Sequence, residues 1–415
     1  MSGLVATLTA VLGILVVALV VRLLVRNHDR VAYASVLVAV GLVVPTLAPA
    51  LRLDLTADVI FLLLLPAIIF HGTTTLNVRE LRHNAPLIGV LTLVGLPVAV
   101  GILGVAGTAV FGFDLSIALL FAAVILPTDP AAVLSIFNQL DVAERLAITI
   151  EGESLLNDGV AIVIFSSLLA SYRAAGESVT SLATPAGLAS FTGDVAVVGG
   201  GGLLIGATVG YLAHRLVRRL DDTMAILLVS VVVAYGSFLV VEHYLHLSGV
   251  LATVGAGLAM GAHEETHAHM SDPEETVQEV WSTLSFLVTT VLYVLIGSAV
   301  PPTAFIEHWQ LVALAAVLVV VVRAITIYPL VSATNLVTAD PIPRRCQHIM
   351  VWGGLHTVVP VALVLSLPAS VTAGRPLETM VFGVAILSIV VQGLLMPTAL
   401  DLTGLANSAE GEESA

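Results

Sequence analysis

Carboxylates in surroundings that exclude water are the feature of this sequence that most strongly suggests chemistry. Asp129 lies in the apolar run ILPTDPAAVLSIF, and Asp158 lies in ITIEGESLLNDGVAIVIF. A charge in such surroundings costs several kcal/mol unless it is paired or neutralised, so it indicates function. The residues around the two aspartates supply further oxygen ligands, namely Glu151, Glu153, Ser154 and Asn157. We interpret the cluster as a site that exchanges protons against a small cation.

The composition indicates that membrane-spanning helices position this cluster. Of 415 residues, 58% are hydrophobic and 11% charged, and the mean hydropathy is +1.05. Soluble domains are about 25% charged, and a spanning helix needs about 20 apolar residues. We count 13 such windows, at residues 3–25, 31–50, 55–72, 86–110, 115–138, 144–171, 190–213, 223–242, 247–262, 278–299, 309–337, 346–369 and 377–400. The sequence therefore predicts an all-α polytopic membrane protein over residues 1–400, with a short acidic cytoplasmic tail at 401–415.

The arginines predict the orientation in the membrane. All 15 cationic side chains are arginine. With an outer N-terminus and 13 spans, the cytoplasmic connections hold 11 arginines and the outer connections 3, as the positive-inside rule requires. We therefore expect a multi-pass protein of the cytoplasmic membrane with its C-terminus inside. The net charge of −14 without any lysine resembles the composition of proteins from high-salt prokaryotes, with an acidic cytoplasmic surface as the alternative interpretation. The negative charge also argues against a nucleic-acid partner.

Two of the predicted spans are interrupted in a similar way. The window 115–138 is broken at Pro127–Pro130, and the window 346–369 at Gly353–Pro360. Proline removes a backbone donor and frees the carbonyl four residues earlier, so each break exposes backbone dipoles. Paired broken helices in corresponding halves indicate the binding site of a transporter. Under the 13-span topology the two windows run in opposite directions, as an inverted repeat requires.

Helical spacing divides the polar residues of the window 144–171 between two faces. Glu151, Ser154 and Asp158 stand at i, i+3 and i+7 and share one face, while Glu153 and Asn157 share the neighbouring face. The first face can direct the oxygens of Ser154 and Asp158 towards the break that carries the other aspartate. The second face needs a partner of its own.

That partner is predicted to be Arg323, which lies near the middle of the window 309–337. A Glu153–Arg323 pair would neutralise both groups and connect the two halves of the chain. The alternative is that the Arg323 side chain extends to the membrane interface. Its central position in the window favours the pair.

At these residues the chain resembles the monovalent cation:proton antiporters, in the NhaP-like and NHE-like sodium/proton exchanger branch. The resemblance rests on Thr128-Asp129-Pro130, the string GESLLND at 152–158, Arg323 with Tyr328-Pro329, and the string WGGL at 352–355. It implies the NhaA-like antiporter fold, with inverted repeats and two crossed discontinuous helices. It further implies a homodimer that works by elevator-like alternating access. The implied divisions are core helices at about 86–171 and 309–400, dimerisation or scaffold helices at about 1–72 and 223–299, and a linker helix at about 190–213.

The resemblance also implies roles for individual residues. Asp129, Ser154 and Asp158 are expected to bind Na⁺, assisted by the backbone near Thr128, and Glu153 and Arg323 to form a structural ion pair. Family members with asparagine before the aspartate, as in Asn157-Asp158, resemble electroneutral exchangers. If one carboxylate alternately holds Na⁺ or H⁺, each half-cycle moves the same charge. We therefore predict one Na⁺ exchanged per H⁺.

Histidines mark the departures from the family pattern. His71 stands where many relatives have an acidic residue, and His356 where many have arginine. Because histidine titrates near neutral pH, both are candidates for pH gating, together with Glu151. The alternative for each histidine is a neutral imidazole that hydrogen-bonds a nearby carbonyl. Three further histidines, at 263, 267 and 269, belong to the polar stretch 262–279, which we interpret as a solvated loop rather than a metal site or pH sensor.

Other functions remain as alternatives at this point. The ion exchanged against protons is either Na⁺ or K⁺, since oxygen ligands suit both. If it is Na⁺, we expect Li⁺ to be transported as well. Two intramembrane aspartates also occur in intramembrane aspartyl proteases, but those expect a GxGD context, whereas the contexts here are PTDP and LNDG. A cation channel would show a repeated carbonyl filter, which the sequence lacks. We therefore predict a transporter of a monovalent cation and protons in a lipid bilayer, neither an enzyme nor dependent on an organic cofactor.

Overall fold

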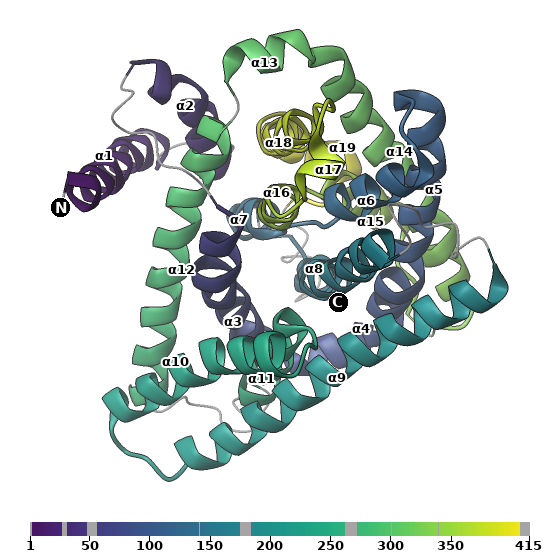
Figure 1. Cartoon of the computed structure of the whole chain (residues 1–415). Coiled ribbons are helices and arrows are strands. Elements are labelled where there is room, and N and C mark those ends of the chain that lie inside the picture. The colour runs from purple at the N-terminus through teal and green to yellow at the C-terminus, as the bar shows by residue number, and fades with distance from the viewer. Residues whose placement is uncertain are drawn as a thin grey trace.

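The computed structural model describes residues 2–26, 31–47, 56–140, 142–174, 184–261, 272–299, 301–338 and 340–406, and the regular structure in these ranges is helical (Figure 1). The helices are α1 (Ser2–Val25), α2 (Tyr33–Leu47), α3 (Leu65–Thr75), α4 (Val78–Val90), α5 (Leu96–Phe111), α6 (Leu115–Ile125), α7 (Ala131–Gln139), α8 (Glu144–Ala174), α9 (Pro185–Val217), α10 (Thr223–Leu239), α11 (Gly249–Gly261), α12 (Asp272–Ala299), α13 (Pro302–Glu307), α14 (Trp309–Thr334), α15 (Arg344–Trp352), α16 (Val358–Leu365), α17 (Ala369–Thr372), α18 (Leu377–Leu387) and α19 (Gly393–Thr403). Four π-helical segments extend or join them, at Val59–Leu64, Leu91–Gly95, Val240–Tyr244 and Ser388–Gln392.

The predicted spans fall on these helices, but their ends differ. Eight helical runs of the described chain are long and apolar enough to cross a membrane, and four shorter apolar helices accompany them. The total of 13 spans stays a prediction. Helix α4 begins at Val78, before the predicted window, because the side chain of Asn77 caps it by accepting a hydrogen bond from the Glu80 backbone nitrogen at 3.1 Å.

The polar stretch 262–279 is shorter as a loop than predicted. Residues 262–271, with the three histidines, lie outside the described residues, and the chain is helical from Asp272 onward. The acidic tail also begins later than predicted. Helix α19 continues to Thr403 and ends at Gly404, whose positive φ of 66° favours glycine.

The helices form two groups that face each other (Figure 1). Helices α1, α2, α3, α10, α11 and α12 pack together, and we call them the scaffold group. Helices α4 to α8 and α14 to α19 pack together, and we call them the core group. Helix α9 runs diagonally along the edge of both, packed mainly on α11 and also touching α8 and α10.

Glycines allow α9 and α11 to approach closely. Gly202, Gly206 and Gly210 recur at every fourth residue of α9, so they lie on one face of the helix. A Cβ atom at any of the three would overlap the backbone of Ser248 or of α11. Small residues at this spacing are the usual means by which membrane helices pack backbone to backbone.

The two interrupted helices cross at their breaks, which confirms the predicted fold class. The first runs from α6 to α7 through Pro127 and Pro130, and the second from α15 to α16 through Gly353 and Gly354. The backbone groups that each break frees bond to the other break, since the nitrogen of Asp129 donates to the carbonyl oxygen of Leu355 at 2.7 Å. Irregular backbone at this depth is tolerated because it is satisfied by protein.

Candidate functional site

Asp129 lies at the crossing, where the N-termini of two half-helices meet. One carboxylate oxygen accepts a hydrogen bond from the backbone nitrogen of Ala131 at 2.9 Å, in the first turn of α7. The other oxygen accepts from the hydroxyl of Thr357, the residue that precedes α16. Helix N-termini carry partial positive charge, so both half-helices favour a negative charge at this position.

Asp158 faces the same break from the continuous helix α8. Its carboxylate accepts a hydrogen bond from the backbone nitrogen of Thr128 and lies within electrostatic reach of Asp129. Its Oδ1 atom is buried and has no hydrogen-bond partner among the described residues. A buried carboxylate oxygen without a hydrogen-bond donor is unfavourable. Asp158 is therefore the side chain of the site that most requires a proton or a cation.

The hydroxyl of Thr128 connects the break to α8. Its Oγ1 atom lies 3.1 Å from Oγ of Ser154 and accepts a hydrogen bond from Nδ2 of Asn157 at 3.4 Å. All three residues are buried. The network fixes the face of α8 that carries Ser154 and Asp158 against the break, and it places a second hydroxyl oxygen beside the carboxylates.

Glu153 and Arg323 form a buried ion pair. The Nη2 atom of Arg323 lies 3.0 Å from Oε1 and 3.1 Å from Oε2 of Glu153. The Nε atom of Arg323 donates to the carbonyl oxygen of Met350 at 3.1 Å. Three helices, α8, α14 and α15, are therefore connected through one guanidinium. The pair carries no net charge, so the charge of the site depends on the two aspartates.

His356 lies inside the second break and bonds the first. Its Nδ1 atom is 2.8 Å from the carbonyl oxygen of Pro127. A carbonyl oxygen only accepts hydrogen bonds, so Nδ1 carries a proton. This is the arrangement expected for an imidazole that hydrogen-bonds a nearby carbonyl, the alternative to a role in pH gating. The Nε2 atom of His356 has no partner among the described residues. The residue lines a cavity of about 30 Å³ together with Asn157, Glu153 and Arg323. A cavity of this size accommodates a water molecule.

Two of the candidate residues are not bonded to the aspartates. Glu151 lies on α8 and makes no hydrogen bond or ion pair with the described residues. His71 lies on α3 in the scaffold group, and its buried Nδ1 atom has no partner there either. Neither Glu151 nor His71 therefore has a hydrogen bond, among the described residues, through which its titration would act on the exchange site.

Sequence reasoning located the second break but did not predict the partners of its residues at the crossing. Thr357 holds Asp129, and Leu355 accepts its backbone hydrogen bond. Gly354 makes room for the ion pair, because a Cβ atom there would come within 2.6 Å of Cδ and Cζ of Arg323. The signals were present as a double glycine and a threonine just before a half-helix, but they do not reveal which partners they meet.

The ligand types at the crossing suit an alkali cation. The site offers carboxylate, hydroxyl and backbone oxygens, and hard cations prefer oxygen ligands. Within the described part of the chain, no group of three or more histidine, cysteine, aspartate or glutamate side chains is arranged to hold a metal ion.

Known proteins resemble the chain over nearly its whole length. Residues 5–402 match the family described as sodium/hydrogen exchanger, transmembrane. The chain is 32% identical over 377 residues to the Na⁺/H⁺ antiporter ApNhaP of Aphanothece halophytica, which covers 91% of this chain and 70% of that protein. It is 31% identical over 395 residues to the Na⁺/H⁺ antiporter NhaP of Pseudomonas aeruginosa, covering 92% and 88% respectively.

The fold resembles a solved structure as well. The sodium proton antiporter MjNhaP1 from Methanocaldococcus jannaschii matches with a TM-score of 0.78. The match covers 98% of this chain and 100% of that one at 18% sequence identity. At this identity the likeness concerns the fold, which agrees with the crossed-helix architecture expected from the sequence.

Proposed function

The chain belongs to the sodium/hydrogen exchanger family, and we propose that it exchanges one Na⁺ for one H⁺ across the cell membrane at Asp158. The family is one of transporters rather than enzymes, so the protease alternative is dropped. The observation that carries the proposal is the buried, unpartnered Oδ1 atom of Asp158 beside a second carboxylate.

The proposed chemistry is competition for one carboxylate. Asp129 keeps its hydrogen bonds from Ala131 and Thr357 throughout, so its charge stays constant. Asp158 is either protonated or coordinates Na⁺, together with Asp129 and the oxygens of Ser154 and the backbone near Thr128. Because the Glu153–Arg323 pair is neutral in both states, the loaded site has the same charge with either ion. An electroneutral 1:1 exchange follows.

The proposed motion is an elevator-like shift of the core group against the scaffold group. Both half-helix breaks, α8 and the ion pair belong to the core group, so the site can move as one body. The scaffold group, α1 to α3 and α10 to α12, would hold this body and form a homodimer. Helix α9 would act as the linker, with the N-terminus outside and the C-terminus in the cytoplasm.

The test is proton flux in proteoliposomes that hold a pH-sensitive dye, with Na⁺, Li⁺ or K⁺ added in turn. Wild type is expected to release protons on addition of Na⁺ or Li⁺, and Asp158→Asn is expected to release none. Release with K⁺ alone would keep the mechanism and replace the substrate. A folded, correctly inserted wild-type protein that releases no protons with any of the three cations would reject the exchange.

A further inference from the structure

Tyr293 carries a buried hydroxyl that has no role in the exchange proposed above. The residue lies on α12 in the scaffold group and is only 5% exposed. Its hydroxyl oxygen is buried and has no hydrogen-bond partner among the described residues. Buried tyrosine hydroxyls usually find a partner, because a buried unpaired donor is unfavourable. This hydroxyl therefore calls for a partner that the observed arrangement does not supply.

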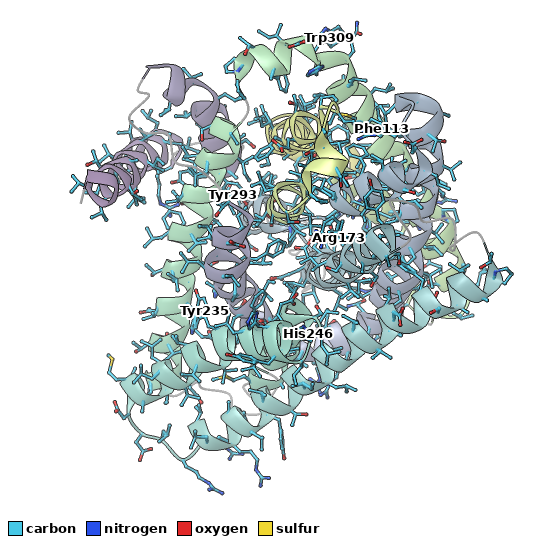
Figure 2. All side chains as sticks on the ribbon, in the orientation of Figure 1. Phe113, Arg173, Tyr235, His246, Tyr293 and Trp309 are labelled. Carbon is cyan, nitrogen blue, oxygen red and sulfur yellow. The ribbon has the colours of Figure 1, made fainter. Side chains whose placement is uncertain are left out.

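The candidate partner of this hydroxyl is Asp129, at the crossing of the two breaks. Tyr293 is within electrostatic reach of Asp129, and it lies on the inner side of α12, towards the core group (Figure 2). Asp129 has accepting capacity left, since a carboxylate offers about four acceptor positions and the described hydrogen bonds to it come from Ala131 and Thr357. Both of those donors belong to the core group.

A second hydroxyl on α12 shows the same property. Thr290 stands one turn before Tyr293 and shares its face of the helix. The Thr290 hydroxyl is also buried and without a partner among the described residues. The adjacent Thr289 behaves as helix threonines usually do, since its hydroxyl donates to the carbonyl oxygen of Ser285 at 2.7 Å. The buried hydroxyls of α12 that lack a partner among the described residues are therefore those of Thr290 and Tyr293, one turn apart.

Packing alone explains the tyrosine ring but not its hydroxyl. A phenylalanine would fill the same apolar space without a donor to satisfy. Elsewhere in the scaffold group, the hydroxyl of Tyr235 is satisfied by the carbonyl oxygen of Leu63 at 2.9 Å. The Tyr235 hydroxyl thus has a partner within its own group of helices, whereas the charged group within electrostatic reach of Tyr293 is Asp129 in the core group.

We propose that Tyr293 is a positioning residue for the exchange, through whose hydroxyl the scaffold group holds the Asp129 carboxylate, directly or through one water, in one of the transport states. This inference rests on the proposed function. The contact would form and break as the core group moves, so it would stabilise one side of the cycle and orient Asp129 for the cation. Its loss should alter the cation affinity more than the folding of the protein.

The first experiment compares Tyr293→Phe with the matched control Tyr235→Phe in proteoliposomes. Both substitutions remove one hydroxyl and leave the ring. We expect Tyr293→Phe to raise the KM for Na⁺ about tenfold, as loss of a hydrogen bond to a charged group does, and Tyr235→Phe to leave it within about twofold. Because the hydroxyl of Tyr293 has no partner in this state, the melting temperature of Tyr293→Phe should stay close to wild type.

A double-mutant cycle identifies the partner. The apparent Kd for Na⁺ is measured from the rise in melting temperature with Na⁺ concentration, in wild type, Tyr293→Phe, Asp129→Asn and the double mutant. If Tyr293 acts through Asp129, its substitution changes the Kd in wild type and not in the Asp129→Asn background. An equal change in both backgrounds, or an unchanged KM for Tyr293→Phe, overturns the inference. A wild-type protein without exchange activity would instead reject the proposed function.

Discussion

Removing one member of the Glu153–Arg323 pair is predicted to destabilise the protein strongly. Both side chains are buried, with exposures of 6% and 8%, and the guanidinium contacts both carboxylate oxygens at 3.0 and 3.1 Å. Arg323→Gln leaves a buried carboxylate without its counter-charge, which costs roughly 3–5 kcal/mol. For a chain of this size we expect the melting temperature to fall by roughly 3–6 °C.

The assay is thermal unfolding of the purified protein in detergent, followed by the loss of the monodisperse peak in size-exclusion chromatography. The matched control is Arg145→Gln, because Arg145 pairs with Asp340 at 2.7 Å but Asp340 is 54% exposed. The partly exposed pair contributes at most about 1 kcal/mol, and the hydrogen bond from Nε of Arg145 to Asn84 at 3.3 Å contributes about 1 kcal/mol more. This variant should therefore melt within about 2 °C of wild type.

The double substitution Glu153→Gln with Arg323→Gln completes the test, since it leaves no uncompensated charge. It is predicted to melt above Arg323→Gln. Two results would refute the reasoning. One is a melting temperature of Arg323→Gln that matches the Arg145→Gln control. The other is a double mutant that melts below Arg323→Gln, since the pair would then contribute through packing rather than through charge.

Three other predictions concern the crossing and the competition at the site. Thr357→Val removes a hydrogen-bond donor to Asp129. It should raise the KM for Na⁺ in vesicle transport about tenfold, and an unchanged KM would contradict this role of Thr357. Gly354→Ala inserts a methyl group against Arg323 and should lower the melting temperature, whereas Gly101→Ala, where nothing lies within 4 Å, should not. Because H⁺ and Na⁺ compete for Asp158, the apparent KM for Na⁺ should rise as the pH falls, by up to about tenfold per unit, and a KM independent of pH between 6 and 9 would contradict competition.

The two interruptions could be predicted from the residues themselves because proline chemistry is local, whereas the crossing of the two helices was expected only from the resemblance to the antiporter family. Pro127 and Pro130 lack a backbone N–H in any fold, so the break in the helix could be predicted without knowing which segment packs against it. Helical spacing separated Glu153 from Ser154 and Asp158 on α8, but Asn157, which it assigned to the face of Glu153, bonds Thr128 of the break. Glu153 and Arg323 could be paired because few embedded charges compete for each other in so apolar a chain.

Contacts between distant segments could not be read in this way. The hydroxyl of Thr357 meets Asp129, 228 residues earlier in the chain, and neither position signals the other. Tyr293 stands in an ordinary apolar stretch, where a tyrosine is expected as packing. The helix ends were also missed, since α4 and α12 continue beyond the apolar windows into polar residues that still complete helical turns. Hydropathy measures the membrane-embedded part of a helix rather than its full length.

The most direct test of the central account is to count the protons released when Na⁺ binds to the purified protein. Titration calorimetry in buffers of different ionisation enthalpy gives this number without vesicles or a membrane potential. At a pH where Asp158 is protonated in the empty site, we predict about one proton released per Na⁺ bound by wild type, and none by Asp158→Asn. Na⁺ binding to wild type without proton release, or undiminished release from Asp158→Asn, would contradict exchange at this carboxylate.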